Sequence, residues 1–328
     1  MRAIQVTEFG EPDVLRLVDT DAPEPGPGEV AIDVAYAGVN FAEILARSTG
    51  FRVPQVPFRP GLEVSGRVRA LGEGAADLTD LSIGQEVAAF LPHGGYAEVA
   101  VAPAAQVLPI PDGVSLRTAA TLPTVLPTAH ALVHEVGRLR AGESLLVRAA
   151  AGGVGTVAGQ LAKRVGAGAV YGVVSSPAKA EFALEHGYDQ VFVGDDWERQ
   201  AAEATGGRGV DLVLDPLGGE QLLRALDVLA PFGRVVSFGN ASHEDPWRLG
   251  AAELNSAGRS AAAFSIMMLA RAEPGALRAL SQRAFQPVAD GAVELPVTAE
   301  LPLAEAAQAH RLIESRTTTG KLLLRVTG

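Results

Sequence analysis

A glycine-rich turn between an apolar segment and a helical one restricts the fold of this chain more than any other feature. Leu145–Arg148 is typical of a strand, and it leads into the spacing Ala149-x-x-Gly152-x-x-Gly155, after which a helix begins. Glycines at these positions let the backbone approach a pyrophosphate, and a helix N-terminus supplies unpaired N–H groups and the positive end of its dipole. A structural turn without a ligand is the alternative. Strand, turn and helix in this order favour a dinucleotide site made of Ala151, Gly152, Gly153, Val154 and Gly155.

From Pro123 onward, apolar strand segments alternate with helical ones, beginning with helices over Gly155–Val165 and Pro177–His186. Six strands are predicted: Ser144–Ala149, Ala169–Val174, Gln190–Val193, Val210–Asp215, Gly233–Phe238 and Ser260–Ser265. Apolar strands that alternate with helices predict an α/β fold with a doubly wound parallel sheet, covered on both faces.

The chain before Pro123 has a different texture, with short runs of period-two alternation between glycines and prolines. Examples are Glu29–Tyr36, Val64–Ala70 and Gly95–Val101. This pattern predicts a compact, mainly β domain. The last stretch, 267–328, is predicted to hold two helices and a terminal strand, Lys321–Val326.

Composition excludes several classes of protein. The 328 residues contain no cysteine, which removes disulfides, thiolate metal sites and cysteine nucleophiles. A formal charge of −11 argues against nucleic-acid and anionic-membrane partners. The longest apolar run, Ala261–Ala270, is about half of a membrane span, and the first residues lack the apolar region of a secretory signal. We therefore expect a cytoplasmic protein.

The segment after the second predicted strand indicates which nucleotide is bound. Chains that bind NAD usually carry Asp or Glu there to hold the ribose 2′-hydroxyl. Here the sequence has Ser175, Ser176 and Lys179, which offer two hydroxyls and a cation to a 2′-phosphate. The alternative is a helix-capping serine beside a surface lysine. Together with the glycine-rich turn, the segment favours NADPH.

Several further motifs occur in an order that is more specific than any one of them. They are Val39–Arg47, Pro60–Glu63, Gly94–Glu98, Asp112–Val114, Val235–Asn240 and Glu314–Lys321. With the glycine-rich turn, they make the whole chain resemble the zinc-independent, NADPH-dependent quinone oxidoreductase (zeta-crystallin-like) branch of the medium-chain dehydrogenases/reductases. The resemblance implies a GroES-like β domain, 1–122 together with 267–328, beside a Rossmann domain, 123–266, with the active cleft between them.

The resemblance also implies the roles of individual residues. Asn40 and Thr128 lie near the nicotinamide, and the backbone of Phe238, Gly239 and Asn240 holds its carboxamide. Lys179 and Arg316 meet the 2′-phosphate. Asn40 as a turn residue and Arg316 as a surface cation are the structural alternatives.

Three departures from relatives matter. Asn40 and Leu62 stand where zinc-dependent relatives have a cysteine and a histidine ligand, so no metal is expected. Phe51 is the nearest counterpart of a tyrosine that lies over the cleft in many members. Gly194 replaces a tyrosine near the adenosine phosphate.

Three histidines are candidate site residues. His130 and His134 have the spacing of metal ligands on a helix but lack a third ligand. His93, at the expected cleft edge, could relay a proton, although a loop histidine is more often solvated.

The expected cleft offers Asn40, Phe51, Thr128, Phe238 and Phe264 but no obvious buried acid/base pair. A quinone needs none, because water can protonate the reduced product. We therefore expect hydride transfer from NADPH to a quinone or a similar small-molecule acceptor. The alternatives are an enone or enoyl-thioester reductase, which usually needs a proton donor, and a non-catalytic NADPH-binding protein. The resemblance and the uncharged strand Ser260–Ser265 imply a homodimer paired through that edge.

Overall fold

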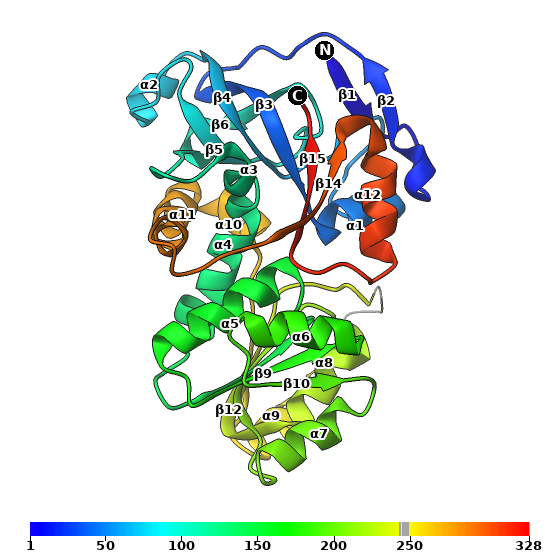
Figure 1. The fold of residues 1–328 in the computed structure, drawn as a ribbon, viewed down its shortest axis with the longest axis vertical. Coiled ribbons are helices and arrows are strands. Elements are labelled where there is room, and N and C mark those ends of the chain that lie inside the picture. The colour runs from blue at the N-terminus through cyan, green and yellow to red at the C-terminus, as the bar shows by residue number, and fades with distance from the viewer. Residues whose placement is uncertain (243, 245–248, 328) are drawn as a thin grey trace. The chain divides into compact units, whose positions relative to one another are not determined.

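The computed structural model describes residues 1–242, 244 and 249–327. The fold divides into two compact units, Met1–Pro127 with Met267–Gly328, and Thr128–Ile266 (Figure 1). The first crossing between units falls within α4 (Leu122–His130), between Pro127 and Thr128, a few residues after the boundary expected at 122/123. No helix in the described ranges combines the length and the apolar character that crossing a membrane requires.

The second unit is built on a six-stranded sheet in which every neighbouring pair is parallel. The strand order is β10-β9-β8-β11-β12-β13, so the crossovers reverse direction between β8 and β11. Ligands of doubly wound sheets bind at this switch point, outside the carboxyl ends of the strands. The α/β fold class predicted from the sequence is confirmed. The strands are β8 (Ser144–Arg148), β9 (Ala169–Val174), β10 (Gln190–Val193), β11 (Val210–Asp215), β12 (Leu229–Ser237) and β13 (Ser260–Ala263).

The helices of this unit follow the expected alternation with shifted ends. The long helix after the glycine-rich turn begins at Gly153 rather than at Gly155, and its side chains Val157, Ala158 and Leu161 are buried. β12 begins at Leu229, ahead of the predicted Gly233, because Leu229 pairs with Val210 before the register shifts. The helices are a π-helical segment (Ala131–Val136), α5 (Gly153–Val165), α6 (Pro177–Glu185), α7 (Trp197–Ala204), α8 (Gly219–Asp227) and α9 (Ala251–Asn255).

The first unit is a mainly β structure around one apolar core. Its larger sheet has the order β14-β15-β3-β4-β5-β7, with β6 also paired to β3, and β1 pairs with β2. The strands are β1 (Arg2–Gln5), β2 (Arg16–Asp19), β3 (Glu29–Val39), β4 (Glu63–Leu71), β5 (Glu86–Phe90), β6 (Val99–Pro103), β7 (Val107–Pro109), β14 (Val297–Pro302) and β15 (Lys321–Arg325). Its helices besides α4 are α1 (Phe41–Thr49), α2 (Ala75–Leu78), α3 (Leu116–Ala119), α10 (Ile266–Ala272), α11 (Pro274–Ala289) and α12 (Ala306–Glu314), with 3₁₀ turns at Pro12–Val14, Ala104–Gln106 and Leu303–Glu305.

The C-terminal stretch, 267–328, contains more helices and strands than the two helices and one strand predicted for it. Besides α10, α11 and α12 it contains β14, which is short and ends at Pro302. β14 pairs in parallel with β15, and β15 runs antiparallel to β3, with Leu322 opposite Val39. This register brings Lys321 to the end of β3, where Asn40 follows.

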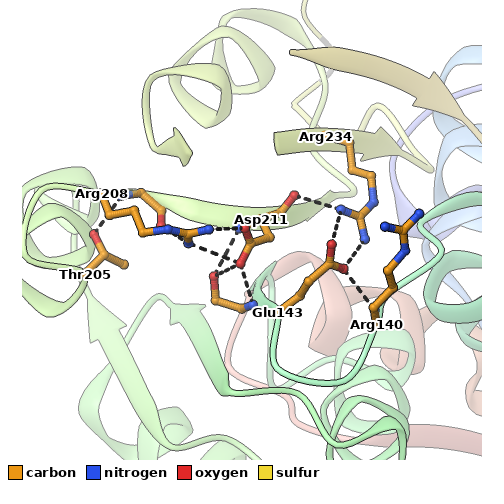
Figure 2. A network of polar contacts seen from close by, with 8 residues as sticks. Arg140, Glu143, Thr205, Arg208, Asp211 and Arg234 are labelled. Atoms are coloured by element: carbon orange, nitrogen blue, oxygen red, sulfur yellow. Dashed lines mark hydrogen bonds and ion pairs between the residues drawn. The ribbon is translucent and has the colours of Figure 1, made fainter. Parts of the chain in front are cut away.

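A network of ion pairs and hydrogen bonds links the starts of β8 and β11 to the middle of β12 (Figure 2). Asp211 at the start of β11 accepts hydrogen bonds from the N–H and hydroxyl of Ser144, both at 2.8 Å, and from Arg208 at 2.6 Å. Beside it, Arg234 of β12 pairs with Glu143 at 2.6 Å. Burial raises the pKa of Asp211, but the hydrogen bonds from Arg208 and Ser144 outweigh it and lower the pKa to about 2.

Replacement of Asp211 by Asn should destabilise the protein in a pH-dependent way. A carboxylate whose pKa is lower in the folded state stabilises that state above its unfolded pKa, and the effect fades as the pH falls through the folded value. We expect Asp211→Asn to lower the free energy of unfolding by about 1–2 kcal/mol near neutral pH. The difference should shrink as the pH falls from about 4 to about 2. Denaturant unfolding followed by circular dichroism measures both.

The control is Asp196→Asn, which removes an exposed pair with Arg199 and should lower stability much less than Asp211→Asn does. An Asp211→Asn effect of the same size at all pH values would contradict the prediction.

Candidate active site

The glycine-rich turn links β8 to α5 and exposes the beginning of that helix. The N–H of Gly152 is bonded to the Ala149 carbonyl at 3.0 Å, and Thr156 donates its N–H and its hydroxyl to the Gly152 carbonyl, both at 2.8 Å. By α-helical geometry, the N–H groups of Gly153, Val154 and Gly155 have no carbonyl acceptor within the helix. These donors and the helix dipole can hold a pyrophosphate.

Two residues of this turn have an unusual backbone conformation or an unusually close contact. Ala149 adopts a left-handed backbone conformation, with φ of 55°, at the position where the common fingerprint has glycine. Gly155 packs so closely that a Cβ atom would lie 2.5 Å from the Ala150 carbonyl oxygen. Only glycine allows this approach of helix to turn, which is the packing role expected for Gly155.

The loop after β9 lies at the same edge of the sheet as the turn after β8. The two strands are parallel neighbours, and the N–H of Ala150 donates to the Val173 carbonyl at 3.1 Å. Ser175 is exposed, Ser176 is the N-cap residue of α6, and Lys179 lies in the first turn of that helix. The segment from Ser175 to Lys179 contains no carboxylate. It can therefore receive a phosphate without charge repulsion.

The segment Phe238–Asn240 follows β12 at this edge as well. The Phe238 N–H donates to the Asp215 carbonyl at 2.9 Å, and a Cβ on Gly239 would lie 2.6 Å from the Pro216 carbonyl oxygen. Asn240 is exposed, and its side-chain amide donates to the Glu244 carbonyl at 3.0 Å. The structure thus brings three predicted cofactor-binding segments of this unit together: Ala151–Gly155, Ser175–Lys179 and Phe238–Asn240. Thr128 is buried in α4, and Phe264 directly follows β13.

In the other unit, Asn40 is the N-cap residue of α1 and belongs to a buried polar cluster. Its Nδ2 donates to Glu63 Oε1 at 3.0 Å and to Glu43 Oε1 at 3.3 Å. Its Oδ1 accepts a hydrogen bond from the Lys321 ammonium, whose Nζ lies 2.5 Å from Glu63 Oε1. Asn40 thus caps α1 and takes part in this cluster, and its role beside the nicotinamide stays a prediction.

The charged members of this cluster are excluded from water. Glu43, Glu63 and Lys321 are 2%, 0% and 3% exposed. Burial raises the pKa of Glu43 to about 7, while the charge of Lys321 opposes the shift and that of Glu63 adds to it. The sequence offered no obvious buried acid/base pair for the expected cleft, whereas the structure buries two carboxyl groups and an ammonium around Asn40. Glu43 stands three residues after the N-cap Asn40, and its Oε2 accepts the Asn40 N–H at 2.9 Å, so the spacing of a capping box was the available signal.

A cavity of about 500 Å³ lies next to this cluster, within the first unit. Its walls are mainly apolar, with Phe51, Phe58, Leu62 and Met267 among them, and Glu43 and His93 are among the polar groups. Phe51 is 42% exposed, and the guanidinium carbon of Arg52 lies 5.1 Å from the centre of its ring. The cavity can take a planar apolar ligand against an aromatic wall.

Two further predicted positions lie on loops. Arg316 is exposed between α12 and β15 and has φ of 55°. Gly194 follows β10 with φ of 92°, and the space around a Cβ at this position is open. The proposed binding roles of all these residues remain predictions.

Comparisons with known proteins agree along the whole chain. Residues 26–112 match the alcohol dehydrogenase GroES-like domain, and residues 153–282 match the zinc-binding dehydrogenase family. A quinone oxidoreductase of Pseudomonas aeruginosa is 34% identical over 327 residues, covering 98% of this chain and 99% of the relative. The chain belongs to the quinone oxidoreductase family of medium-chain dehydrogenases/reductases. The family expected from the sequence motifs is confirmed.

Solved structures of this family are closely similar. The Escherichia coli quinone oxidoreductase in complex with NADPH has a TM-score of 0.91 and 29% identity, covering 99% of this chain and 100% of that one. A mycobacterial protein in complex with NADPH also has a TM-score of 0.91, with 35% identity and the same coverage. The GroES-like and Rossmann parts expected from the sequence are therefore present.

The residues around Asn40 do not suit the zinc ion implied by the name of the second matching domain. An amide and the apolar Leu62 stand where zinc-dependent relatives have ligands, and a cation beside the Lys321 ammonium would be repelled. His130 and His134 have ring centres 4.4 Å apart, but the described part of the chain has no group of three His, Cys, Asp or Glu side chains arranged to hold a metal.

Elemental analysis of the purified protein should find no stoichiometric zinc, because the donor set is wrong. Chelator treatment should also leave its activity unchanged. Activity that a chelator removes and zinc restores would refute this prediction.

Proposed function

We propose that this protein is a metal-independent oxidoreductase that transfers hydride from NADPH to a quinone or a similar electron-poor acceptor. The observation that carries the proposal is the edge of the Rossmann sheet, where unpaired N–H groups at the start of α5 lie beside a loop with two hydroxyls, a lysine and no carboxylate. This combination suits a dinucleotide with a 2′-phosphate. The whole-chain likeness to quinone oxidoreductases, including structures solved with NADPH, supports it.

The chain's own residues bind and orient the reactants in this proposal. The N–H groups of Gly153–Gly155 hold the pyrophosphate, and Ser175, Ser176 and Lys179 hold the 2′-phosphate, with Arg316 as a second cation. Asn40, Thr128 and the backbone of Phe238–Asn240 orient the nicotinamide. NADPH supplies the hydride from its C4 atom.

The acceptor occupies the cavity beside Phe51, where the apolar wall excludes water and the aromatic face stacks on a flat ring. Glu43 also lines this cavity, but both of its carboxyl oxygens accept N–H donors from Asn40 or Leu62. We infer that Glu43 has a structural role and that solvent protonates the reduced quinone. A carbon–carbon double bond usually needs a placed acid, so the enone or enoyl-thioester reductase is the second candidate.

The test is NADPH oxidation with a panel of quinones, enals and enoyl thioesters, followed by the loss of NADPH absorbance. We expect turnover with quinones and slow reaction with the others. Preference for enoyl thioesters would favour the second candidate. Tight NADPH binding with no turnover would favour a non-catalytic protein.

We further propose a homodimer that pairs through β13. This strand is at the end of the sheet, pairs only with β12 in the described chain, and exposes Ser260, Ala262 and Ala263. An open, uncharged edge strand is an aggregation hazard, and pairing across a two-fold axis removes it. Ala262→Asp should therefore give monomers or insoluble protein in sedimentation experiments. An unmodified chain that sediments as a monomer at micromolar concentration would contradict the proposal.

We propose the cytoplasm as the location of the protein. Without cysteine, the chain forms no disulfide bond that an oxidising compartment would maintain. Fractionation of cells, with the protein detected by antibody, would test this placement, and recovery from the membrane or secreted fraction would refute it.

A further inference from the structure

The cluster around Asn40 determines which way its carboxamide points. Oxygen and nitrogen of an asparagine amide are usually assigned from their neighbours. Here the neighbours leave one choice, because the Lys321 ammonium only donates hydrogen bonds, so the amide atom beside it is the oxygen. Lys321 Nζ donates to Oδ1, and Nδ2 donates to Glu63 Oε1 at 3.0 Å and to Glu43 Oε1 at 3.3 Å.

The two groups that orient this amide are themselves held by the sheet. Glu63 begins β4, and its Oε2 accepts the Thr124 N–H at 2.9 Å. Its carboxylate also packs against β3, since a Cβ on Gly38 would lie 2.3 Å from Oε1. Lys321 begins β15, whose antiparallel register with β3 places it next to Asn40. Both anchors therefore sit on paired strands, whereas Asn40 lies between a strand and a helix.

We propose that Lys321 and Glu63 are positioning residues that turn the Asn40 carboxamide so that it offers a ligand only a hydrogen-bond acceptor. Both hydrogens of Nδ2 are bonded within the cluster, which leaves the second lone pair of Oδ1. The ligand group that meets it must be a donor, such as a hydroxyl or an amide N–H. This inference rests on the proposed function, in which Asn40 contacts the nicotinamide end of NADPH.

The positioning role predicts that Lys321 acts through Asn40, which a double-mutant cycle measures. Lys321→Met and Asn40→Ala should each lower kcat/KM for NADPH-dependent quinone reduction by about tenfold or more. The double variant should be no worse than the poorer single variant. Costs that multiply in the double variant would overturn the proposal.

A matched control and a second variant keep this cycle interpretable. Lys163→Met removes another lysine ion pair, to Asp189, in which the lysine side chain is 42% exposed, and it should change activity less than about twofold. Where Lys321→Met does not fold, Glu63→Gln removes charge from the same pair with little change in volume. Glu63→Gln combined with Asn40→Ala should again lower kcat/KM no further than the poorer single variant does. Losses of kcat/KM that multiply in the double variant would overturn the proposal.

A spectroscopic readout separates this inference from the proposed function, because it needs no turnover. In ¹⁵N-labelled protein, the side-chain amide of Asn40 should give two distinct, slowly exchanging proton signals, assigned by their absence in Asn40→Ala. Lys321→Met should shift them and speed their exchange with solvent. Unchanged signals in Lys321→Met would refute positioning, whereas shifted signals in an enzyme that reduces no quinone would refute only the proposed function.

Discussion

Phe51→Tyr is expected to raise the turnover of enones and enoyl thioesters by about a hundredfold, the low end of general acid catalysis, and to leave quinone turnover nearly unchanged. Phe51 lines the apolar cavity, so a phenol there would present a proton to a bound acceptor. The Arg52 guanidinium over the ring would stabilise the phenolate left after proton transfer. A quinone gains little, because solvent can protonate its reduced oxygen.

The matched control is Phe58→Tyr, which adds a phenol elsewhere on the wall of the same cavity. Steady-state kinetics with one quinone and one enoyl thioester should separate the two variants. An unmodified protein that prefers enoyl thioesters and ignores quinones would contradict this prediction. So would equal gains from Phe51→Tyr and Phe58→Tyr.

Lys179→Ala is expected to raise the KM for NADPH by about tenfold or more while sparing NADH. Loss of a cation that pairs with a phosphate costs about 1.5–3 kcal/mol, and NADH lacks that phosphate. Lys179 lies in the first turn of α6, beside the two serines that follow β9. Kinetics with both cofactors measure the change in preference.

Lys163→Ala serves as the control. Lys163 lies in α5 and pairs with Asp189, so its removal leaves the loop after β9 unchanged. Arg316→Ala tests the second proposed cation separately. Equal use of NADPH and NADH by the unmodified protein would exclude the role given to Lys179.

The parts of this fold that were predicted from sequence depend on residues close together in the chain. The alternation of apolar strands and helices after Pro123 predicted the parallel sheet, because its inner strands are buried on both faces and read as continuous apolar runs between the helices. The turn Ala149–Gly155 was predicted for the same reason, since strand, glycines and helix are consecutive. The errors lay in the ends of elements, such as the start of α5, and in the C-terminal stretch, where a third helix and β14 were not predicted.

The buried cluster around Asn40 could not be derived in this way. Its members come from α1, β4 and β15, and Lys321 is separated from Asn40 by almost the whole chain. In the sequence, Glu63 and Lys321 are two charged residues of the kind that usually face water. The pairing of β15 with β3 removes them from water and makes them depend on each other, and the same burial raises the pKa of Glu43.

The sequence by itself therefore determined the family, the sheet and the glycine-rich turn, because local periodicity and glycine stereochemistry specify them. Only the tertiary structure decided which charges are buried and how the Asn40 amide is oriented, because burial and hydrogen-bond direction arise when strands far apart in the chain pair.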